Sequence, residues 1–148
     1  MQQAWIQTLS FMFSVVEVKM AISYWRKRDR YYRLIGSSCN DCNSLFFPPV
    51  HGCRKCHSTN IKDEEMSMEG KLITYTILHE SMEGFEKQIP MIIGLIELDN
   101  RVKVVGQIVD SSPSDVSEGS KVSVVFRKVG TDGPSGPIFY GYKFVIQV

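Results

Sequence analysis

The residues with the clearest chemical potential are the four cysteines, spaced Cys39-x2-Cys42-x10-Cys53-x2-Cys56. Thiolates two residues apart let backbone amides fold around the sulfurs, and two such pairs can place four ligands tetrahedrally about one ion. Structural zinc requires this arrangement, and four protein ligands leave no open position for a catalytic water. The spacing therefore predicts a structural zinc site.

Other uses of these cysteines fit the sequence less well. Disulfides are disfavoured because the chain is expected to be cytosolic, and a bridge within either pair would close a very short loop. Residues 53–57 (CRKCH) match a c-type haem attachment pattern, but no export signal is recognisable and the first cysteine pair would be unexplained. With four thiols available, we interpret His51 and His57 as surface residues. No βαβ pattern accompanies either pair, which disfavours a redox role.

Size, composition and charge narrow the function classes. A chain of 148 residues has no room for a large cofactor-binding enzyme fold together with a substrate domain. Hydrophobic residues make up 43% and charged residues 22%, which excludes wholesale disorder and a membrane bundle. The net charge is +1, but residues 1–62 carry +6 and residues 63–148 carry −5. This balance argues against a dedicated nucleic-acid protein.

An N-terminal helical segment is expected over residues 1–35. Good helix formers without Gly or Pro occupy residues 17–35, and Gly36 is expected to end the helix. The apolar stretch 4–24 is interrupted by polar residues and lacks a cleavage signature, so we interpret it neither as a signal peptide nor as a membrane anchor. Residues 1–19 are expected to be disordered or untranslated, with Met20 as an alternative start. A cytoplasmic location follows.

A small ribbon and a barrel are expected to follow this helix. Residues 36–62 are small, polar and Cys-rich, and such a segment folds only when a metal or a covalent bond closes it. From residue 63 the pattern changes to strands with little helical periodicity, which favours a five-stranded OB-fold barrel over 63–148. Periodicity alone leaves an SH3-like barrel or a small sandwich open. The expected strands are 71–79, 91–98, 102–109, 121–129 and 138–147.

The last expected strand carries an apolar stripe, and its preferred interpretation is core rather than a ligand platform. The stripe consists of Ile138, Tyr140, Tyr142, Phe144 and Ile146.

No zinc-protease, nucleophile-elbow, P-loop or dinucleotide motif occurs in the sequence. The sequence therefore favours a non-catalytic module over a stand-alone enzyme.

Several motifs together give the chain a resemblance to a known family. Residues 46–49 (FFPP) stand between the cysteine pairs, residues 70–76 (GKLITYT) open the first barrel strand, and residues 118–122 (EGSKV) lead into the fourth. Over about residues 20–148 the chain resembles a family long catalogued as a domain of unknown function. Its members join a rubredoxin-like zinc ribbon to an acyl-CoA-associated OB-fold.

The resemblance implies a mainly β protein with an N-terminal helix, and it implies zinc held by all four cysteines. It also implies a non-catalytic subunit that bridges a thiolase to a hydroxymethylglutaryl-CoA synthase, or that helps to shape a CoA site. Neither nucleic acid nor a membrane is the expected partner.

A CoA ester would suit the residue inventory. Its phosphates could meet basic side chains of the helix and ribbon, and its adenine could stack on an aromatic ring. A basic groove with stacking rings on an OB-fold also describes single-stranded nucleic-acid binding, which is the alternative. The acidic balance of residues 63–148 favours the CoA interpretation. The candidate CoA or partner contacts are Arg26, Lys27, Arg30, Phe47, Arg54, Lys55 and Tyr75.

Overall fold

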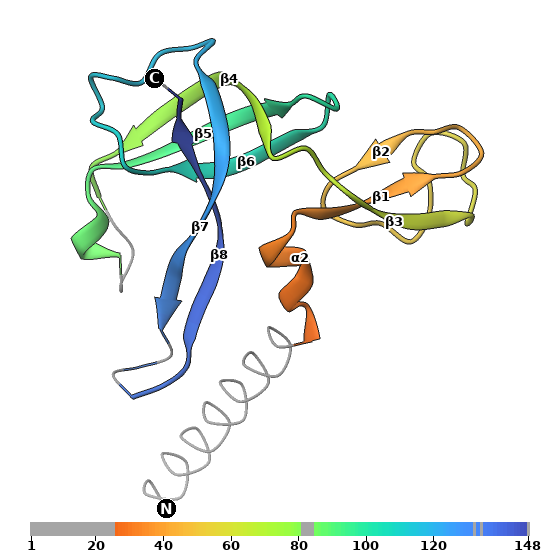
Figure 1. The fold of residues 1–148 in the computed structure, drawn as a ribbon, viewed down its shortest axis with the longest axis horizontal. Helices are drawn as coiled ribbons and strands as arrows, with labels where there is room; N and C mark the ends of the chain where they lie inside the picture. The colour runs from red at the N-terminus through yellow and green to blue at the C-terminus, as the bar shows by residue number, and fades with distance from the viewer. Residues whose placement is uncertain (1–25, 81–84, 132, 134, 148) are drawn as a thin grey trace, which may run out of the picture.

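The computed structural model describes residues 26–147 apart from 81–84, 132 and 134. The expectations for residues 1–25, including the start of the N-terminal helix, lie outside the described residues. The described chain forms a short helix, a small three-stranded sheet and a separate barrel (Figure 1). In the described part of the chain, none of the helices could span a bilayer.

The helix ends earlier than the sequence predicts. Helix α2 spans Arg28–Tyr32, and β1 (Ile35–Cys39) begins where helix was expected, so the stop at Gly36 was wrong. The cause is tertiary, because Leu34 turns into a left-handed conformation with φ 47° and is fully buried. Its carbonyl oxygen accepts a hydrogen bond from the Met66 N–H at 3.1 Å.

The three-stranded sheet has the order β2-β1-β3, with β2 at Leu45–Phe46 and β3 at Ile61–Glu65. All pairs are antiparallel, and Ile35 lies opposite Glu65. Gly36 occupies the central strand where a Cβ atom would collide with the Phe46 carbonyl oxygen. This glycine therefore permits close packing of the ribbon and does not cap a helix.

The second sheet closes into a barrel in the order β4-β5-β6-β8-β7. Its strands lie within two residues of the expected ends, and closure excludes a sandwich. A 3-10 turn, η1 (Glu86–Gln88), precedes β5. The strands are β4 (Glu69–Leu78), β5 (Met91–Leu98), β6 (Lys103–Ile108), β7 (Lys121–Thr131) and β8 (Ile138–Ile146).

One apolar core joins the barrel to the start of the ribbon. Phe144 is fully buried at the barrel centre, while Leu34 and Met66 belong to the same cluster although they flank the ribbon sheet. Asn100, in the turn after β5, donates its side-chain amide to Met66 Sδ at 3.3 Å. The ribbon is therefore anchored to the barrel at the point where both connecting segments enter the core.

Strands β7 and β8 continue beyond the barrel as a hairpin that passes α2 (Figure 1). Tyr32 of α2 packs edge-to-face on Phe126 with ring centroids 4.8 Å apart, and Phe126 stacks on Tyr140 at 5.2 Å. The apolar stripe of β8 is thus core only at its inner end. Ile138 and Tyr140 are exposed, because the hairpin leaves the barrel before reaching them.

A methyl group at Gly106 should destabilise the barrel. A Cβ atom there would overlap the Phe144 ring, and overpacking of this kind costs about 1–3 kcal/mol. Gly106→Ala should therefore lower the free energy of unfolding by that amount in urea denaturation. Gly130→Ala is the matched control, because a Cβ atom at Gly130 meets nothing within 4 Å. Equal stability of the two variants would contradict the packing described.

Candidate metal centre and adjoining pockets

The fold brings all four cysteine sulfurs together. They lie within 4.8 Å of one another, with Cys39 Sγ 3.6 Å from Cys56 Sγ and Cys42 Sγ 3.4 Å from Cys53 Sγ. A Zn–S bond of about 2.3 Å in a tetrahedral site places sulfurs about 3.8 Å apart. The four sulfurs therefore fit a single zinc ion with every position filled by protein.

Two equivalent backbone turns position these sulfurs. The Asn43 N–H donates to the Cys39 carbonyl oxygen at 2.8 Å, and the His57 N–H donates to the Cys53 carbonyl oxygen at 3.0 Å. Asn43 and His57 each follow the second cysteine of a pair, and both adopt positive φ, 54° and 59°. His57 is exposed and serves as this turn residue.

Local hydrogen bonds lower the pKa values of two of the thiols, Cys42 and Cys53. Cys42 Sγ and the Ser44 hydroxyl oxygen are 3.2 Å apart, and hydrogen bonding with the Ser44 side chain and backbone lowers the pKa of Cys42 from 9.0 to about 6. The N–H groups of Cys56 and Lys55, each 3.4 Å from Cys53 Sγ, lower the pKa of Cys53. These donors stabilise thiolates, the form that binds metal.

The Cys56 thiol behaves in the opposite way. A backbone hydrogen bond at Ser58 lowers its pKa, but the Cys53 side chain, burial and the other two thiols outweigh this and raise it to about 12. Four thiolates in one cluster repel each other unless a cation is present. Zinc binding here must therefore release protons.

Polar side chains outside the sulfur cluster tie the two turns together. Asp41 accepts hydrogen bonds from the Ser58 hydroxyl and from the Asn60 side-chain amide, the latter at 3.3 Å. Asn40 donates to Asn60 Oδ1 at 2.8 Å. The first turn is thereby fastened to the segment that leads into β3.

The arm between the cysteine pairs reaches back to the barrel. Ser37 is buried in β1, and its hydroxyl oxygen accepts a hydrogen bond from the Val50 N–H at 3.1 Å. Phe47, on the same arm, packs edge-to-face on Tyr142 of β8 with centroids 5.9 Å apart. The ribbon thus presents one aromatic ring to the barrel wall.

A pocket of about 370 Å³ lies where helix, ribbon and barrel meet. It combines two cations, Arg30 of α2 and Lys103 of β6, with the rings of Phe47 and Tyr142. The remaining lining is Pro48, Val104 and Val105, and Val105 is 62% exposed. Two of the seven candidate contacts, Arg30 and Phe47, therefore share one pocket.

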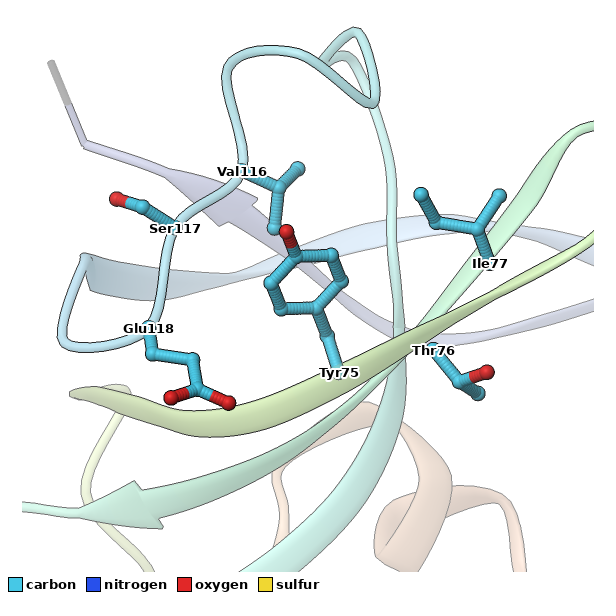
Figure 2. A pocket seen from close by; sticks show the side chains of 6 residues that line it. All are labelled: Tyr75, Thr76, Ile77, Val116, Ser117 and Glu118. Carbon is cyan, nitrogen blue, oxygen red and sulfur yellow. The ribbon is translucent and has the colours of Figure 1, made fainter.

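Tyr75 lies in a different pocket, which Figure 2 shows. Its ring rises from β4 toward the loop that carries Val116, while Glu118 lies beside it. The other lining residues are Thr76, Ile77 and Ser117, so this pocket offers no cation. Glu118 accepts a hydrogen bond from the Thr74 hydroxyl at 3.0 Å.

The remaining four candidates do not line either pocket. Arg26 and Lys27 are exposed at the start of α2, and Arg54 and Lys55 are exposed in the second cysteine turn. Sequence reasoning missed Lys103, because alternation in a strand says only which side chains point outward. No local signal indicates that a ring from the ribbon will lie beside it.

The fold and the sulfur cluster define a protein that joins a zinc ribbon to an OB-fold barrel. Comparison with known families agrees, since residues 27–62 match the ChsH2 rubredoxin-like zinc ribbon domain and residues 63–127 match the ChsH2 C-terminal OB-fold domain. The zinc cofactor and the OB-fold expected from the sequence are thereby confirmed.

Comparison with curated relatives identifies the family to which the chain belongs. A DUF35 domain-containing scaffold protein of Methanocaldococcus jannaschii is 42% identical over 85% of this chain and 90% of its own length. A scaffold protein of the same description from Pyrococcus furiosus is 39% identical over 82% and 88%. The chain belongs to the DUF35 family, as the resemblance predicted.

A solved structure, the Ltp2-ChsH2(DUF35) aldolase, has the same fold. Its TM-score is 0.68 at 23% identity, and the match covers 86% of this chain and 94% of the other. A probable enoyl-CoA hydratase alpha subunit of Thermomonospora curvata is 26% identical over 68% of this chain and 31% of its own length.

Replacing one thiol should release the metal. Cys42→Ser removes one of four sulfurs that close a segment with little core of its own, so the zinc content of the purified protein should fall from one per chain to below a tenth. Atomic absorption measures this directly. His57→Asn is the matched control, because Asn already occupies the equivalent position at Asn43. Full zinc in Cys42→Ser, or loss of zinc in His57→Asn, would contradict the assignment.

The serine beside Cys42 should set the acid stability of the site. Protons compete with zinc for thiolates, and Ser44 holds the pKa of Cys42 at about 6. Without that hydroxyl the pKa of Cys42 rises, so protons displace zinc from the Cys42 thiolate at a higher pH. Ser44→Ala should therefore move the midpoint of zinc release during acidification upward, as followed with a chromogenic chelator. An unchanged or lower midpoint would show that Ser44 does not stabilise the thiolate.

Proposed function

We propose that this chain is a non-catalytic accessory subunit that binds a thiolase-type enzyme in the cytoplasm and helps to hold a CoA ester. The names of the relatives support the role as an accessory, scaffold-type subunit. Three relatives are called scaffold proteins, the third being that of Methanothermobacter thermautotrophicus at 34% identity over 81% of this chain. Each match covers most of both chains, which makes a scaffold role the natural inference.

The pocket between helix, ribbon and barrel supports the second part of the proposal, that the chain helps to hold a CoA ester. It places the cations Arg30 and Lys103 beside the rings of Phe47 and Tyr142. These features complement the nucleotide end of CoA, which carries phosphate groups and an adenine. Guanidinium groups bind phosphate oxygens in pairs, and aromatic rings stack on a base. At about 370 Å³ the pocket can take the nucleotide end of a CoA ester and leave the acyl end to a partner.

The other candidate contacts receive a different role in this proposal. Arg26, Lys27, Arg54 and Lys55 are exposed and would face the partner enzyme. Such a partner could be a thiolase, a hydroxymethylglutaryl-CoA synthase or both. Tyr75 would contact the partner as well, since its pocket holds a carboxylate and no cation.

We propose division of the chain at the boundaries that the sequence suggested. In that division residues 1–35 are the N-terminal segment, 36–62 the ribbon and 63–148 the barrel. Within the described residues the ribbon sheet itself runs from Ile35 to Glu65, so its strand ends lie just beyond these boundaries. In this arrangement the ribbon supplies Phe47 and the barrel supplies Lys103, so neither unit alone forms the pocket. Zinc would then act on ligand binding only through the position of the ribbon.

Affinity capture from the lysate of the source cell, with and without nuclease, tests this function. The zinc-loaded chain should retain a thiolase-type enzyme in near-equal amount, and nuclease should not change the yield. Arg30→Glu with Lys103→Glu should keep the partner but lower the CoA recovered with the complex at least tenfold, because two attractive charges become repulsive. Lys121→Glu, at the start of β7 and outside the pocket lining, is the control and should retain both.

Two results would count against the proposal. Capture of replication, repair or ribosomal proteins that are lost on nuclease treatment would favour the single-stranded nucleic-acid alternative. Equal CoA recovery with the charge-reversed and the control variants would show that the pocket of Arg30 and Lys103 does not hold CoA.

A further inference from the structure

A buried lysine on the barrel has no place in the function proposed above. Lys143 of β8 precedes the core residue Phe144 and therefore points out of the barrel, yet it is only 6% exposed. Gln88 of η1 covers it, and Gln88 Oε1 accepts a hydrogen bond from Lys143 Nζ at 3.2 Å. Burial lowers the pKa of Lys143, and the nearby charge of Asp110 opposes that shift. A buried ammonium group needs a compensating anion more than an exposed one does.

The nearby acceptors are already shared. Gln88 Oε1 also accepts a hydrogen bond from Gln107 Nε2 at 3.2 Å. Asp110 Oδ2 forms an ion pair with Arg127 Nη2 at 2.8 Å. The ammonium group of Lys143 is thus held by a neutral amide, and Asp110, the carboxylate whose charge acts on it, is engaged by another cation.

These side chains line a cavity of about 470 Å³, which extends along the barrel between η1 and β7. A second cavity of about 540 Å³ shares Lys87, Gln88 and Lys128 with the first, so the two form one groove. Within the described residues, four cations line this groove, namely Lys87, Arg127, Lys128 and Lys143. Its carboxylates are Asp110 and Glu86, which leaves an excess of two positive charges.

We propose that this groove, called here the Lys143 groove, binds a phosphorylated small molecule whose phosphate meets the Lys143 ammonium group. A phosphate group supplies two negative charges and several acceptor oxygens, whereas a single carboxylate would leave positive charge uncompensated. The apolar wall of Pro90, Ile92 and Ile108 gives room for an organic portion beside the phosphate. The site shares no residue with the pocket of Arg30 and Phe47, so it does not depend on the accessory role.

Titration of the zinc-loaded full chain with pyrophosphate, followed by calorimetry and by the side-chain amide resonances of Gln88 and Gln107, tests the proposal. Binding should be saturable and should shift both amide signals. Lys143→Met removes the ammonium group but keeps an apolar stem, and it should weaken binding at least tenfold without lowering the melting temperature. Lys121→Gln, outside the groove, should bind as the wild type does. Adenosine diphosphate in place of pyrophosphate distinguishes the source of the phosphate, because tighter binding would show that the organic portion also uses the groove.

Substitutions of exposed groove residues control for the possibility that Lys143→Met weakens binding by disturbing the fold. Lys87→Gln with Lys128→Gln changes surface side chains only and should weaken pyrophosphate binding as well. Binding that is equal in wild type, Lys143→Met and the double variant would overturn the proposal. So would the absence of saturable binding up to about 10 mM, since weaker binding is worth less than about 3 kcal/mol.

Discussion

Closure of the ribbon by four sulfurs is the constraint on which the rest of this structure depends. The ribbon sheet has only short strands, and its two cysteine turns are held by hydrogen bonds among polar side chains rather than by an apolar core. Zinc supplies the missing stabilisation, because metal binding to a segment of this kind is itself folding free energy. Once closed, the ribbon fixes the arm that carries Phe47. That ring then packs on Tyr142 and completes a pocket that the barrel alone does not form.

The barrel contributes the second fixed point. Leu34 and Met66 flank the ribbon sheet but are buried in the barrel core, so ribbon and barrel share their packing. The Leu34 carbonyl and the Met66 N–H also bond to each other, which holds both connecting segments at one place. An arrangement anchored by metal at one end and by core at the other suits a scaffold, since such a protein must keep its contact surfaces in a constant relation.

Local signals in the sequence were sufficient for the metal site and the barrel strands, but not for the short ribbon strands β1, β2 and β3. Cys39, Cys42, Cys53 and Cys56 lie in one short window whose turns are formed by neighbouring residues, and alternation placed the barrel strands within two residues of their ends. The end of α2 was not predictable, because Leu34 leaves the helix to enter a core assembled from distant strands. The pocket of Arg30, Phe47 and Tyr142 joins three separate segments for the same reason. The alternation of β8 also cannot reveal that Lys143 is buried and bonded to Gln88, a residue of a distant segment.

Hydrogen exchange of the backbone amides, compared between zinc-loaded and chelator-treated protein, tests whether zinc holds the ribbon in place. Residues 36–62 should lose protection when zinc is removed, while β5 and β6 should keep theirs because the four cysteine ligands lie outside the core cluster of the described residues. The face of β8 around Tyr142 should lose part of its protection, since Phe47 would no longer cover it. A ribbon that keeps its full protection without zinc would contradict the claim that the metal holds the ribbon, and with it the pocket, in place.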